Sequence, residues 1–336
     1  MSHLSTSNFW QQLVCPRDYA PLERTPNRLL CPHGHTYPIV SGIPIMLLNE
    51  VSITHAACSD TLEQSKRTSV NLAEESVPDR GIHPYVQRMI VGTNGQLYRS
   101  LINQLTEYPI PNLRLPPTSG DLLLDVGCGW GRWCISAARQ GYTVIGIDPS
   151  LEAVLAAQAI AHQLGVTAFF LVADARYLPF ANNTFDSVFS YSVLQHFSKA
   201  DAQTSLQEIS RVLKQRGKAL IQLPQVIGLR NLYNMLRNRR STNIFRVRYW
   251  RLSEIKRVFT DVIGATQLTV DGYFGLGVQP SDIHLLPRKY QLVVRSSEFL
   301  RKLSLRFHWM IHFADSVYAE STKDSASSTL PSAQVR

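Results

Sequence analysis

One stretch of sequence decides the fold: Asp121-Leu-Leu-Leu-Asp-Val-Gly-Cys-Gly-Trp-Gly131. Its apolar beginning is typical of a buried strand, and its alternate glycines predict a tight loop before a helix over 132–140. Four more strands and two more helices are predicted at 142–148, 151–164, 167–172, 185–191, 200–214 and 218–223. Strands that alternate with helices at this spacing pack as right-handed βαβ units, so the sequence predicts an α/β fold with a doubly wound, Rossmann-like sheet.

The composition excludes several classes of protein. Of the 336 residues, 44% are hydrophobic and 18% are charged, which is ordinary for a globular chain. No apolar run reaches the roughly 20 residues that a membrane-spanning helix needs, and the first ten residues do not resemble a secretion signal. Five cysteines, an odd number, are more typical of reduced thiols or metal ligands than of a disulfide framework. The sequence therefore predicts a cytoplasmic protein.

Four zones are predicted along the chain. Residues 11–48 are rich in Cys, Pro and His and indicate a small β-rich module, whereas residues 49–82 are polar with little periodicity and indicate a linker. The α/β domain is expected over 83–322, beginning with a helix over 85–106. The tail 323–336 is expected to be disordered.

Three acidic residues are predicted to meet at one end of the sheet. Asp125, Asp148 and Asp174 each follow a strand, and ligands of doubly wound sheets bind at the carboxyl ends of the strands. The glycine loop, residues 127–131, lets a ligand approach the main chain. A dinucleotide fingerprint needs glycine where this chain has Arg132, so the spacing disfavours a nicotinamide cofactor. The loop and the three acids together indicate a nucleoside site.

These motifs resemble those of class I S-adenosylmethionine-dependent methyltransferases, particularly a subgroup that includes small-molecule and quinone-type enzymes. The resemblance covers about residues 85–225 and rests on Leu124–Trp133, Gly146–Ser150, Ala173–Ala175, Leu178–Phe180 and Tyr191–Phe197. It implies a seven-stranded sheet whose last strand, near 313–320, is antiparallel.

The resemblance also implies S-adenosylmethionine as the cofactor and the residues that bind it. The glycine loop would hold the methionine part, Asp148 the ribose, and Asp174 with Ala175 the adenine. The complete predicted cofactor site is Asp125, Gly127, Cys128, Gly129, Gly131, Asp148, Pro149, Asp174 and Ala175.

Few catalytic residues are expected, because the sulfonium methyl group is already activated and a base is needed only if the acceptor must lose a proton. His196, just beyond the fourth strand, is the predicted base. Tyr191 and Gln195 are predicted to bind the substrate. The alternative for His196 is a role in shaping the pocket.

The N-terminal module carries a predicted metal site. Cys15, Asp18, Cys31 and His35 follow the spacing C-x2-D-x12-C-x3-H, and paired ligands on tight turns are typical of zinc ribbons. The segment resembles the zinc-ribbon module that precedes some methyltransferase domains, including certain ribosomal RNA guanine methyltransferases, but has Asp18 where that pattern has cysteine. Zinc is therefore a second predicted cofactor, with His33 as the rival fourth ligand. A metal-free ribbon held by its core is the alternative.

Positive charge is concentrated in one part of the chain. Nine Lys or Arg residues lie between Arg230 and Arg257, against the single acid Glu254, in a chain of net charge +9. Such a run can face an anionic substrate, RNA or an anionic membrane, or it can be a solvated helix face. It falls within an insertion at about 225–312 that is expected to form a substrate lid.

A basic amphipathic helix is predicted over 292–313. Its apolar residues recur at steps of three and four, at Phe299, Leu303, Phe307, Met310 and Ile311. One interpretation is that this stripe packs onto the domain as part of the lid, and the other is contact with a membrane surface.

The sequence thus predicts an S-adenosylmethionine-dependent methyltransferase that acts on a small or lipid-linked acceptor, with an anionic acceptor as one option. It leaves open whether oxygen, nitrogen or carbon is methylated. An RNA base methyltransferase is the first alternative, suggested by the ribbon and the basic run. A non-catalytic nucleoside-binding regulator is the second.

Overall fold

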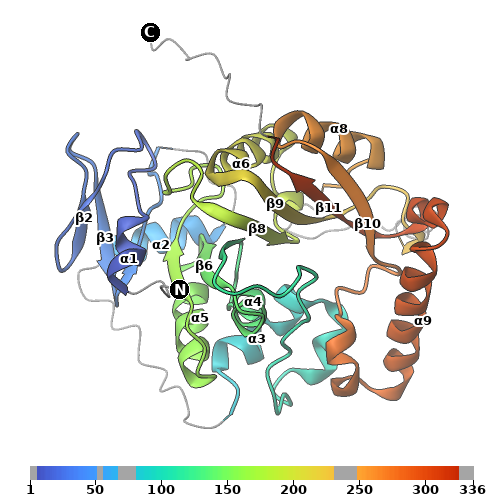
Figure 1. Ribbon diagram of the computed structural model, residues 1–336. Helices are drawn as coiled ribbons and strands as arrows, with labels where there is room; N and C mark the ends of the chain where they lie inside the picture. The colour runs from blue at the N-terminus through green and yellow to red at the C-terminus, as the bar shows by residue number, and fades with distance from the viewer. Residues whose placement is uncertain (1–5, 51–55, 67–80, 231–247, 325–336) are drawn as a thin grey trace.

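The computed structural model describes residues 6–50, 56–66, 81–230 and 248–324 (Figure 1). Most of the predicted tail, parts of the predicted linker and the centre of the basic run, including Arg237, Arg239, Arg240 and Arg246, lie outside the described residues. Within the described ranges, every helix is too short or too polar to cross a membrane.

The large sheet contains seven strands, which are β5 (Leu122–Val126), β6 (Thr143–Asp148), β7 (Phe169–Val172), β8 (Phe185–Tyr191), β9 (Leu213–Pro224), β10 (Thr266–Gly272) and β11 (Ser316–Thr322). Their order across the sheet is β10-β11-β9-β8-β5-β6-β7. The pairs from β7 to β9 are parallel, and β11 is antiparallel to both β9 and β10. The predicted doubly wound sheet with an antiparallel last strand is confirmed.

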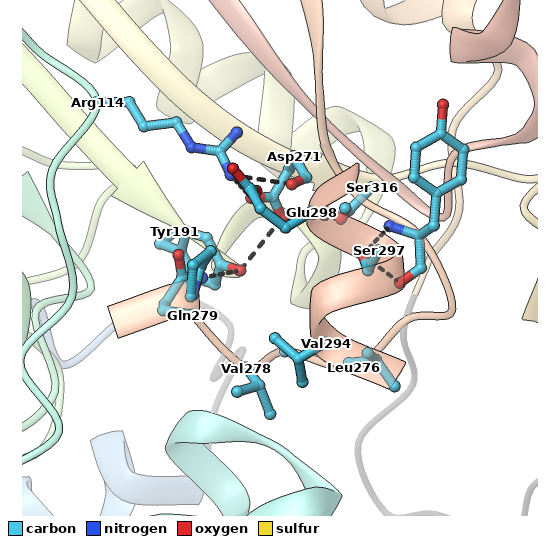
Figure 2. A pocket seen from close by; sticks show the side chains of 14 residues that line it. Arg114, Tyr191, Asp271, Leu276, Val278, Gln279, Val294, Ser297, Glu298 and Ser316 are labelled. Carbon is cyan, nitrogen blue, oxygen red and sulfur yellow. Dashed lines mark hydrogen bonds and ion pairs between the residues drawn. The ribbon is translucent and has the colours of Figure 1, made fainter. Parts of the chain in front are cut away.

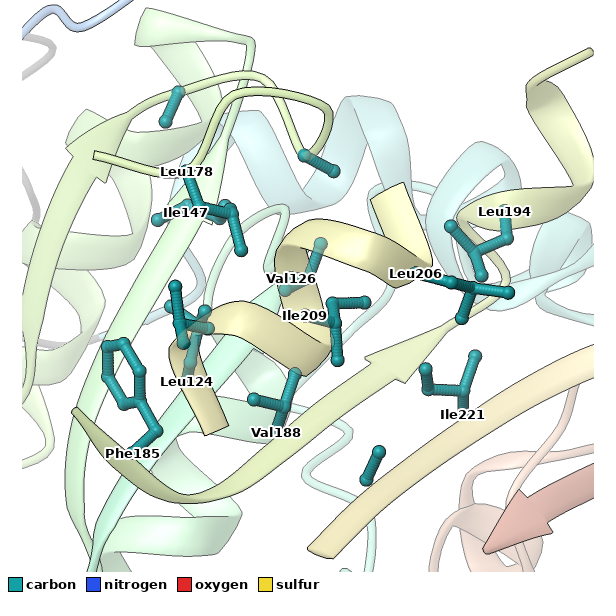
Figure 3. Packing of buried hydrophobic residues seen from close by; sticks show 14 of the residues in the cluster. Leu124, Val126, Ile147, Leu178, Phe185, Val188, Leu194, Leu206, Ile209 and Ile221 are labelled. Atoms are coloured by element: carbon teal, nitrogen blue, oxygen red, sulfur yellow. The ribbon is translucent and has the colours of Figure 1, made fainter. Parts of the chain in front are cut away.

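Helices cover both faces of this sheet (Figure 1). They are α4 (Arg132–Arg139) and α5 (Leu151–Gln163) on one face, and α6 (Lys199–Val212) and α8 (Leu252–Val262) on the other. Along β5, Leu124 and Val126 pack with the α6 layer (Figure 3), whereas Leu123 packs with the α4 layer. This alternation is expected for a strand that is buried on both faces.

Two segments before β5 differ from the prediction. The helix predicted over 85–106 is interrupted at Gly95 (φ +114°), so α3 (Pro84–Asn94) precedes a short 3-10 helix, η1 (Gln96–Leu101). The segment predicted as a polar linker contains α2 (Ala56–Lys66). Thr61 of α2 is buried and accepts a hydrogen bond from the backbone N–H of Leu151 (3.0 Å), so this helix is fixed to the start of α5.

The segment predicted as a lid, 225–312, contributes framework elements as well. β10 pairs along its length with β11, and α8 buries Ile255 and Phe259 completely. Residues 280–313 form η3 (Pro280–Leu285), α9 (Arg288–Ser304) and η4 (His308–Phe313).

The single amphipathic helix predicted over 292–313 is therefore divided, and its apolar stripe packs onto the domain only in part; contact of the exposed part with a membrane stays a prediction. Val294, Ser297 and Ser304 are buried, whereas Phe299 and Phe307 are exposed. Hydrogen bonds explain which side of α9 is buried. The Ser297 hydroxyl accepts from the Tyr273 N–H (3.0 Å) and donates to the Tyr273 carbonyl (3.1 Å), so the small residues of α9 face inward.

The N-terminal module is a short helix followed by a four-stranded antiparallel sheet. Its elements are α1 (Thr6–Gln11), β1 (Glu23–Arg24), β2 (Arg28–Leu30), β3 (Thr36–Val40) and β4 (Ile43–Pro44). The chain after β4 runs beside β7: Ile45 forms a parallel bridge with Val172, and the Met46 N–H donates to the Val172 carbonyl (2.8 Å). The module is thus attached to one margin of the large sheet.

Candidate cofactor and acceptor site

The glycine loop lies between β5 and α4, at the carboxyl end of the sheet. Gly127, Gly129 and Gly131 all have positive φ angles, of +77°, +52° and +82°. A Cβ atom at Gly127 would lie 2.2 Å from the Cγ2 atom of Val193, but one at Gly129 would meet no atom within 4 Å. Open space therefore lies over Gly129, where a ligand can approach the main chain.

Asp125 lies beneath this loop and is completely buried. Its Oδ2 atom accepts a hydrogen bond from the Cys134 thiol (3.1 Å), whereas its Oδ1 atom has no hydrogen-bond partner among the described residues. Burial raises the pKa of Asp125 to about 7 and that of the neighbouring Cys128 thiol to about 11. An orphaned carboxylate oxygen at this place fits the ammonium group of an amino acid such as the methionine part of S-adenosylmethionine.

Asp148, at the end of β6, contacts the same loop. Its Oδ2 atom accepts from the backbone N–H of Gly129, and its Oδ1 atom accepts from that of Ser150, both at 3.0 Å. An ionised carboxylate has about four acceptor sites, so ribose hydroxyls can still bond to it. Next to Asp148, the Pro149 carbonyl accepts a hydrogen bond from Thr61 of α2 (2.9 Å). The sequence did not predict this contact, because the segment that contains Thr61 was interpreted as a linker.

Asp174 is buried, as is Ala175, but its carboxylate is already engaged. Arg176 donates to Oδ2 from Nη2 (2.7 Å) and to Oδ1 from its backbone N–H (2.9 Å) and Nε (3.1 Å). The same arginine also pairs with Asp201 (3.0 Å). The contact of Asp174 with adenine stays a prediction, because this ion pair occupies most of its acceptor positions.

A polar pocket opens beside the ends of β8 and β10 and is lined in part by Arg114, Tyr191, Asp271, Gln279, Glu298 and Ser316 (Figure 2). Tyr191 donates from its hydroxyl to Asp271 Oδ2 (3.2 Å) and accepts from Gln279 Nε2 (2.9 Å). Ser316 donates to the same Asp271 oxygen (2.8 Å), and Arg114 lies 3.4 Å from the other. Burial, reinforced by Asp271, raises the pKa of Tyr191, so its phenol stays protonated and acts as a donor.

The cofactor end of this site lies within a segment that matches a known protein family. The sequence profile of the family described as "Methyltransferase domain" matches residues 123–217. These residues include the glycine loop, Asp148, Asp174 and Tyr191. Residues 123–217 therefore match a methyltransferase domain.

Curated relatives of this methyltransferase domain include two O-methyltransferases. The O-methyltransferase resE of Aspergillus sclerotiorum is 37% identical over 105 residues, which cover 30% of this chain and 39% of that protein. A ubiquinone biosynthesis O-methyltransferase of Brucella anthropi is 34% identical over 118 residues, which cover 31% of this chain and 48% of that protein. The chain thus spans less than half the length of these relatives.

Among solved structures, the YcgJ protein from Bacillus subtilis is similar over 72% of this chain and 99% of its own, with a TM-score of 0.43 and 19% identity.

Two of the predicted acceptor-side residues lie apart from the polar pocket of the methyltransferase domain. Gln195 and His196 follow β8, with His196 ending the 3-10 helix η2 (Leu194–His196), and neither lines the pocket. Their backbone carbonyls accept from the backbone and the side chain of Arg248, at 2.8 and 2.7 Å. The structure therefore brings only Tyr191 to this pocket, and the roles of Gln195 and His196 stay predictions.

The four predicted metal ligands of the N-terminal module do come together. One ligand atom from each of Cys15, Asp18, Cys31 and His35 lies within 4.8 Å of all the others. Two thiols, an imidazole and a carboxylate are a donor set that suits zinc. His33 is outside this group: its Nδ1 atom bonds to Asp18 (2.7 Å), and its side chain is 65% exposed. The arrangement favours His35 over His33 as the fourth ligand.

Proposed function

We propose that this chain is an enzyme that transfers the methyl group of S-adenosylmethionine to a small or lipid-linked acceptor. The observation that carries the proposal is the cofactor end of the methyltransferase domain: open space at Gly129, an orphaned Asp125 oxygen and the Asp148 carboxylate meet there. Both curated relatives are named O-methyltransferases, which favours transfer to an acceptor hydroxyl, so phenols are the first class to test.

The residues have distinct proposed roles. Asp125 would face the ammonium group, Asp148 would accept from the ribose hydroxyls, and Asp174 with Ala175 would line the adenine. When bound, S-adenosylmethionine supplies an activated methyl group. His196 would accept the proton that the acceptor loses, whereas Tyr191 and Gln195 would bind the acceptor.

The N-terminal module is proposed to hold one structural zinc ion through Cys15, Asp18, Cys31 and His35, since this donor set is closed by four protein ligands. None of the five cysteines forms a disulfide bond within the described residues, which suits the reducing cytoplasm as the proposed compartment.

Cofactor binding is tested first, by calorimetry with S-adenosylhomocysteine and with NADH. Asp148→Ala should weaken binding of S-adenosylhomocysteine by about tenfold or more, because a hydrogen bond to a charged group contributes roughly 1.5–3 kcal/mol. Asp121→Ala is the matched control, an exposed aspartate just before the opposite end of β5. Binding of NADH but not of S-adenosylhomocysteine would contradict the proposal.

Acceptor identity is tested by mass spectrometry, as a gain of fourteen mass units on phenols, amines, lipid-linked phenols or RNA. Transfer to RNA alone would replace the proposal by the RNA base methyltransferase. An RNA partner would also show binding that falls by roughly 0.7 log units per log of salt for each single-strand phosphate contacted. Tight cofactor binding with no transfer to any of these acceptors would favour the regulator.

A further inference from the structure

Arg132 is a buried cation to which the described residues give neither a hydrogen bond nor an ion pair. It is the first residue of α4 and only 4% exposed. Across the described parts of the chain, its Nη1 atom has no hydrogen-bond partner and its guanidinium forms no ion pair. Burying an unpaired charge is costly, so buried arginines are normally paired. The missing negative charge is therefore expected from a ligand.

The two nearby acids do not supply that charge in full. Asp125 and Asp282 both interact with Arg132 electrostatically, but each bonds to another group: Asp125 to the Cys134 thiol and Asp282 to the Tyr98 hydroxyl. Burial raises the pKa of both carboxyls, so both are shifted toward their neutral forms. Neither acid forms the direct ion pair that a buried arginine needs.

Aromatic rings hold the guanidinium in place. Its central carbon lies 5.5 Å from the ring centre of Trp133 and 5.6 Å from that of Tyr191. Such faces attract a cation and orient it, yet they leave its N–H groups free to bind an acceptor. The side chain is thus positioned while its hydrogen-bonding capacity is unused.

The position of Arg132 connects the two halves of the site. It directly follows Gly131 of the glycine loop, and the first turn of α4, which has no side-chain cap, adds backbone N–H groups that favour an anion. The Tyr191 ring that it faces carries the hydroxyl that lines the polar pocket. An anion bound here would lie between the cofactor and the acceptor.

We infer that Arg132 binds a carboxylate group at this junction, because the planar guanidinium fork matches a carboxylate in a bidentate pair. The inference rests on the proposed function, in which two molecules could carry that group. One is S-adenosylmethionine, through its amino-acid carboxylate, and the other is an acceptor that bears a carboxylate.

The experiment compares wild type with Arg132→Gln, Arg132→Lys and the control Arg139→Gln, an exposed arginine at the end of the same helix. Calorimetry measures S-adenosylhomocysteine, its decarboxylated analogue and, with S-adenosylhomocysteine present, benzoate against benzamide. If the cofactor supplies the carboxylate, Arg132→Gln weakens S-adenosylhomocysteine at least tenfold and leaves the analogue unchanged. If the acceptor supplies it, only benzoate binding is lost. Arg132→Lys keeps the positive charge but loses the planar fork, so its affinity for the carboxylate ligand should lie between those of wild type and Arg132→Gln.

Binding of S-adenosylhomocysteine and binding of benzoate together distinguish failure of the proposed function from failure of the inference about Arg132. If wild type binds no S-adenosylhomocysteine, the proposed function fails, and benzoate binding without it still reports on Arg132. Unchanged binding of S-adenosylhomocysteine and benzoate by Arg132→Gln would overturn the inference. Thermal unfolding of the ligand-free protein adds a check: removing an unpaired buried charge should leave the melting temperature equal or higher, whereas loss of a purely structural arginine would lower it.

An exposed apolar cluster on α9 and η4 carries a second, independent inference. Leu292, Phe299, Leu305 and Trp309 are each between 59% and 69% exposed, and Phe313 packs edge to face against Trp309. Leu292 and Phe299 are seven residues apart and so share one face of α9, and a row of large exposed apolar side chains marks an interaction site.

The charges around this cluster indicate its partner. Exposed basic residues accompany it, namely Arg288, Lys289, Arg295, Lys302 and Arg306. Glu298, the one acid of α9, is already paired with Arg301. A second copy of the chain would bring like charges together, which disfavours a dimer through this surface.

We propose that α9 and η4 dock on an anionic lipid bilayer, with the aromatic and leucine side chains in the interface and the basic residues on the headgroups. Val294 and Glu298 of the same helix line the polar pocket from the inward side of α9, so docking through the exposed side would leave α9 between the pocket and the membrane.

The test is co-sedimentation of the full chain with vesicles of phosphatidylcholine alone or with one third phosphatidylserine. Wild type should pellet only with the anionic vesicles, and the combined variant Leu292→Ser, Phe299→Ser, Trp309→Ser should lose at least tenfold in bound fraction. Met89→Ser, an exposed apolar residue of α3, is the control and should bind as wild type. Equal pelleting of wild type and the triple variant, or a wild-type dimer that the triple variant abolishes, would overturn the proposal.

Discussion

The glycine loop gives a stability prediction whose size follows from two separate costs. Gly127→Ala places a side chain at φ +77°, which costs roughly 1–2 kcal/mol for an L-residue. The new Cβ atom would also lie 2.2 Å from Val193 Cγ2. Valine is stiff about χ1 and cannot turn away freely, so overpacking adds about 1–3 kcal/mol. The free energy of unfolding should therefore fall by about 2–5 kcal/mol.

Urea denaturation in two backgrounds separates these costs. In Val193→Ala the colliding methyl group is absent, so adding Gly127→Ala should cost only the backbone part, about 1–2 kcal/mol. Gly165→Ala is the control, because Gly165 also has a positive φ (+63°) but open space around its Cβ position. The reasoning is refuted if Gly127→Ala costs the same in both backgrounds, or no more than Gly165→Ala.

Three further predictions concern single side chains. The pKa of Asp125 is raised from 3.8 to about 7, so between these pH values the folded state keeps the carboxyl proton that the unfolded chain has lost. The free energy of unfolding of wild type should therefore fall between pH 4 and pH 7, by a few kcal/mol relative to Asp125→Asn. Parallel pH profiles of the two proteins would contradict this. Purified protein should carry about one zinc, which Cys31→Ser loses and His33→Ala keeps, and metal analysis showing none in wild type would favour a metal-free ribbon. His196→Ala should lower turnover by roughly a hundredfold with unchanged affinity for S-adenosylhomocysteine, and unchanged single-turnover rates would leave it a pocket-shaping role.

The central sheet could be predicted because its strands are buried on both faces and lie between glycines and amphipathic helices. β10 could not, because its burial does not alternate regularly along Thr266–Gly272 and it follows a long basic segment. α2 was missed for a related reason: its sequence is polar overall, and it is anchored by the Thr61 hydroxyl, bonded to the start of α5, and by the small apolar contacts of Cys58 and Leu62.

The candidate site, like the fold, could be predicted from the sequence only in part. The glycine loop and Asp148 are local features, so sequence spacing placed them correctly at the carboxyl end of the sheet. The polar pocket joins Arg114, Tyr191 and Asp271 from distant parts of the chain, and no local pattern marks that junction. In the sequence, Arg132 was notable only because a nicotinamide-binding loop has glycine at that position. Its burial without a partner is a property of the tertiary structure.

The attachment of the N-terminal module to β7 has a consequence for aggregation. β7 is the last strand of the large sheet on its side, and such a strand would present unpaired backbone groups to other molecules. The bond from the Met46 N–H to Val172 and the stacking of Phe9 on Phe169 cover part of this margin, and the bridge from Leu13 to Phe180 attaches the module beyond the end of β7. The small module thus acts as a physical stop that keeps parallel-sheet growth from continuing into a neighbouring chain.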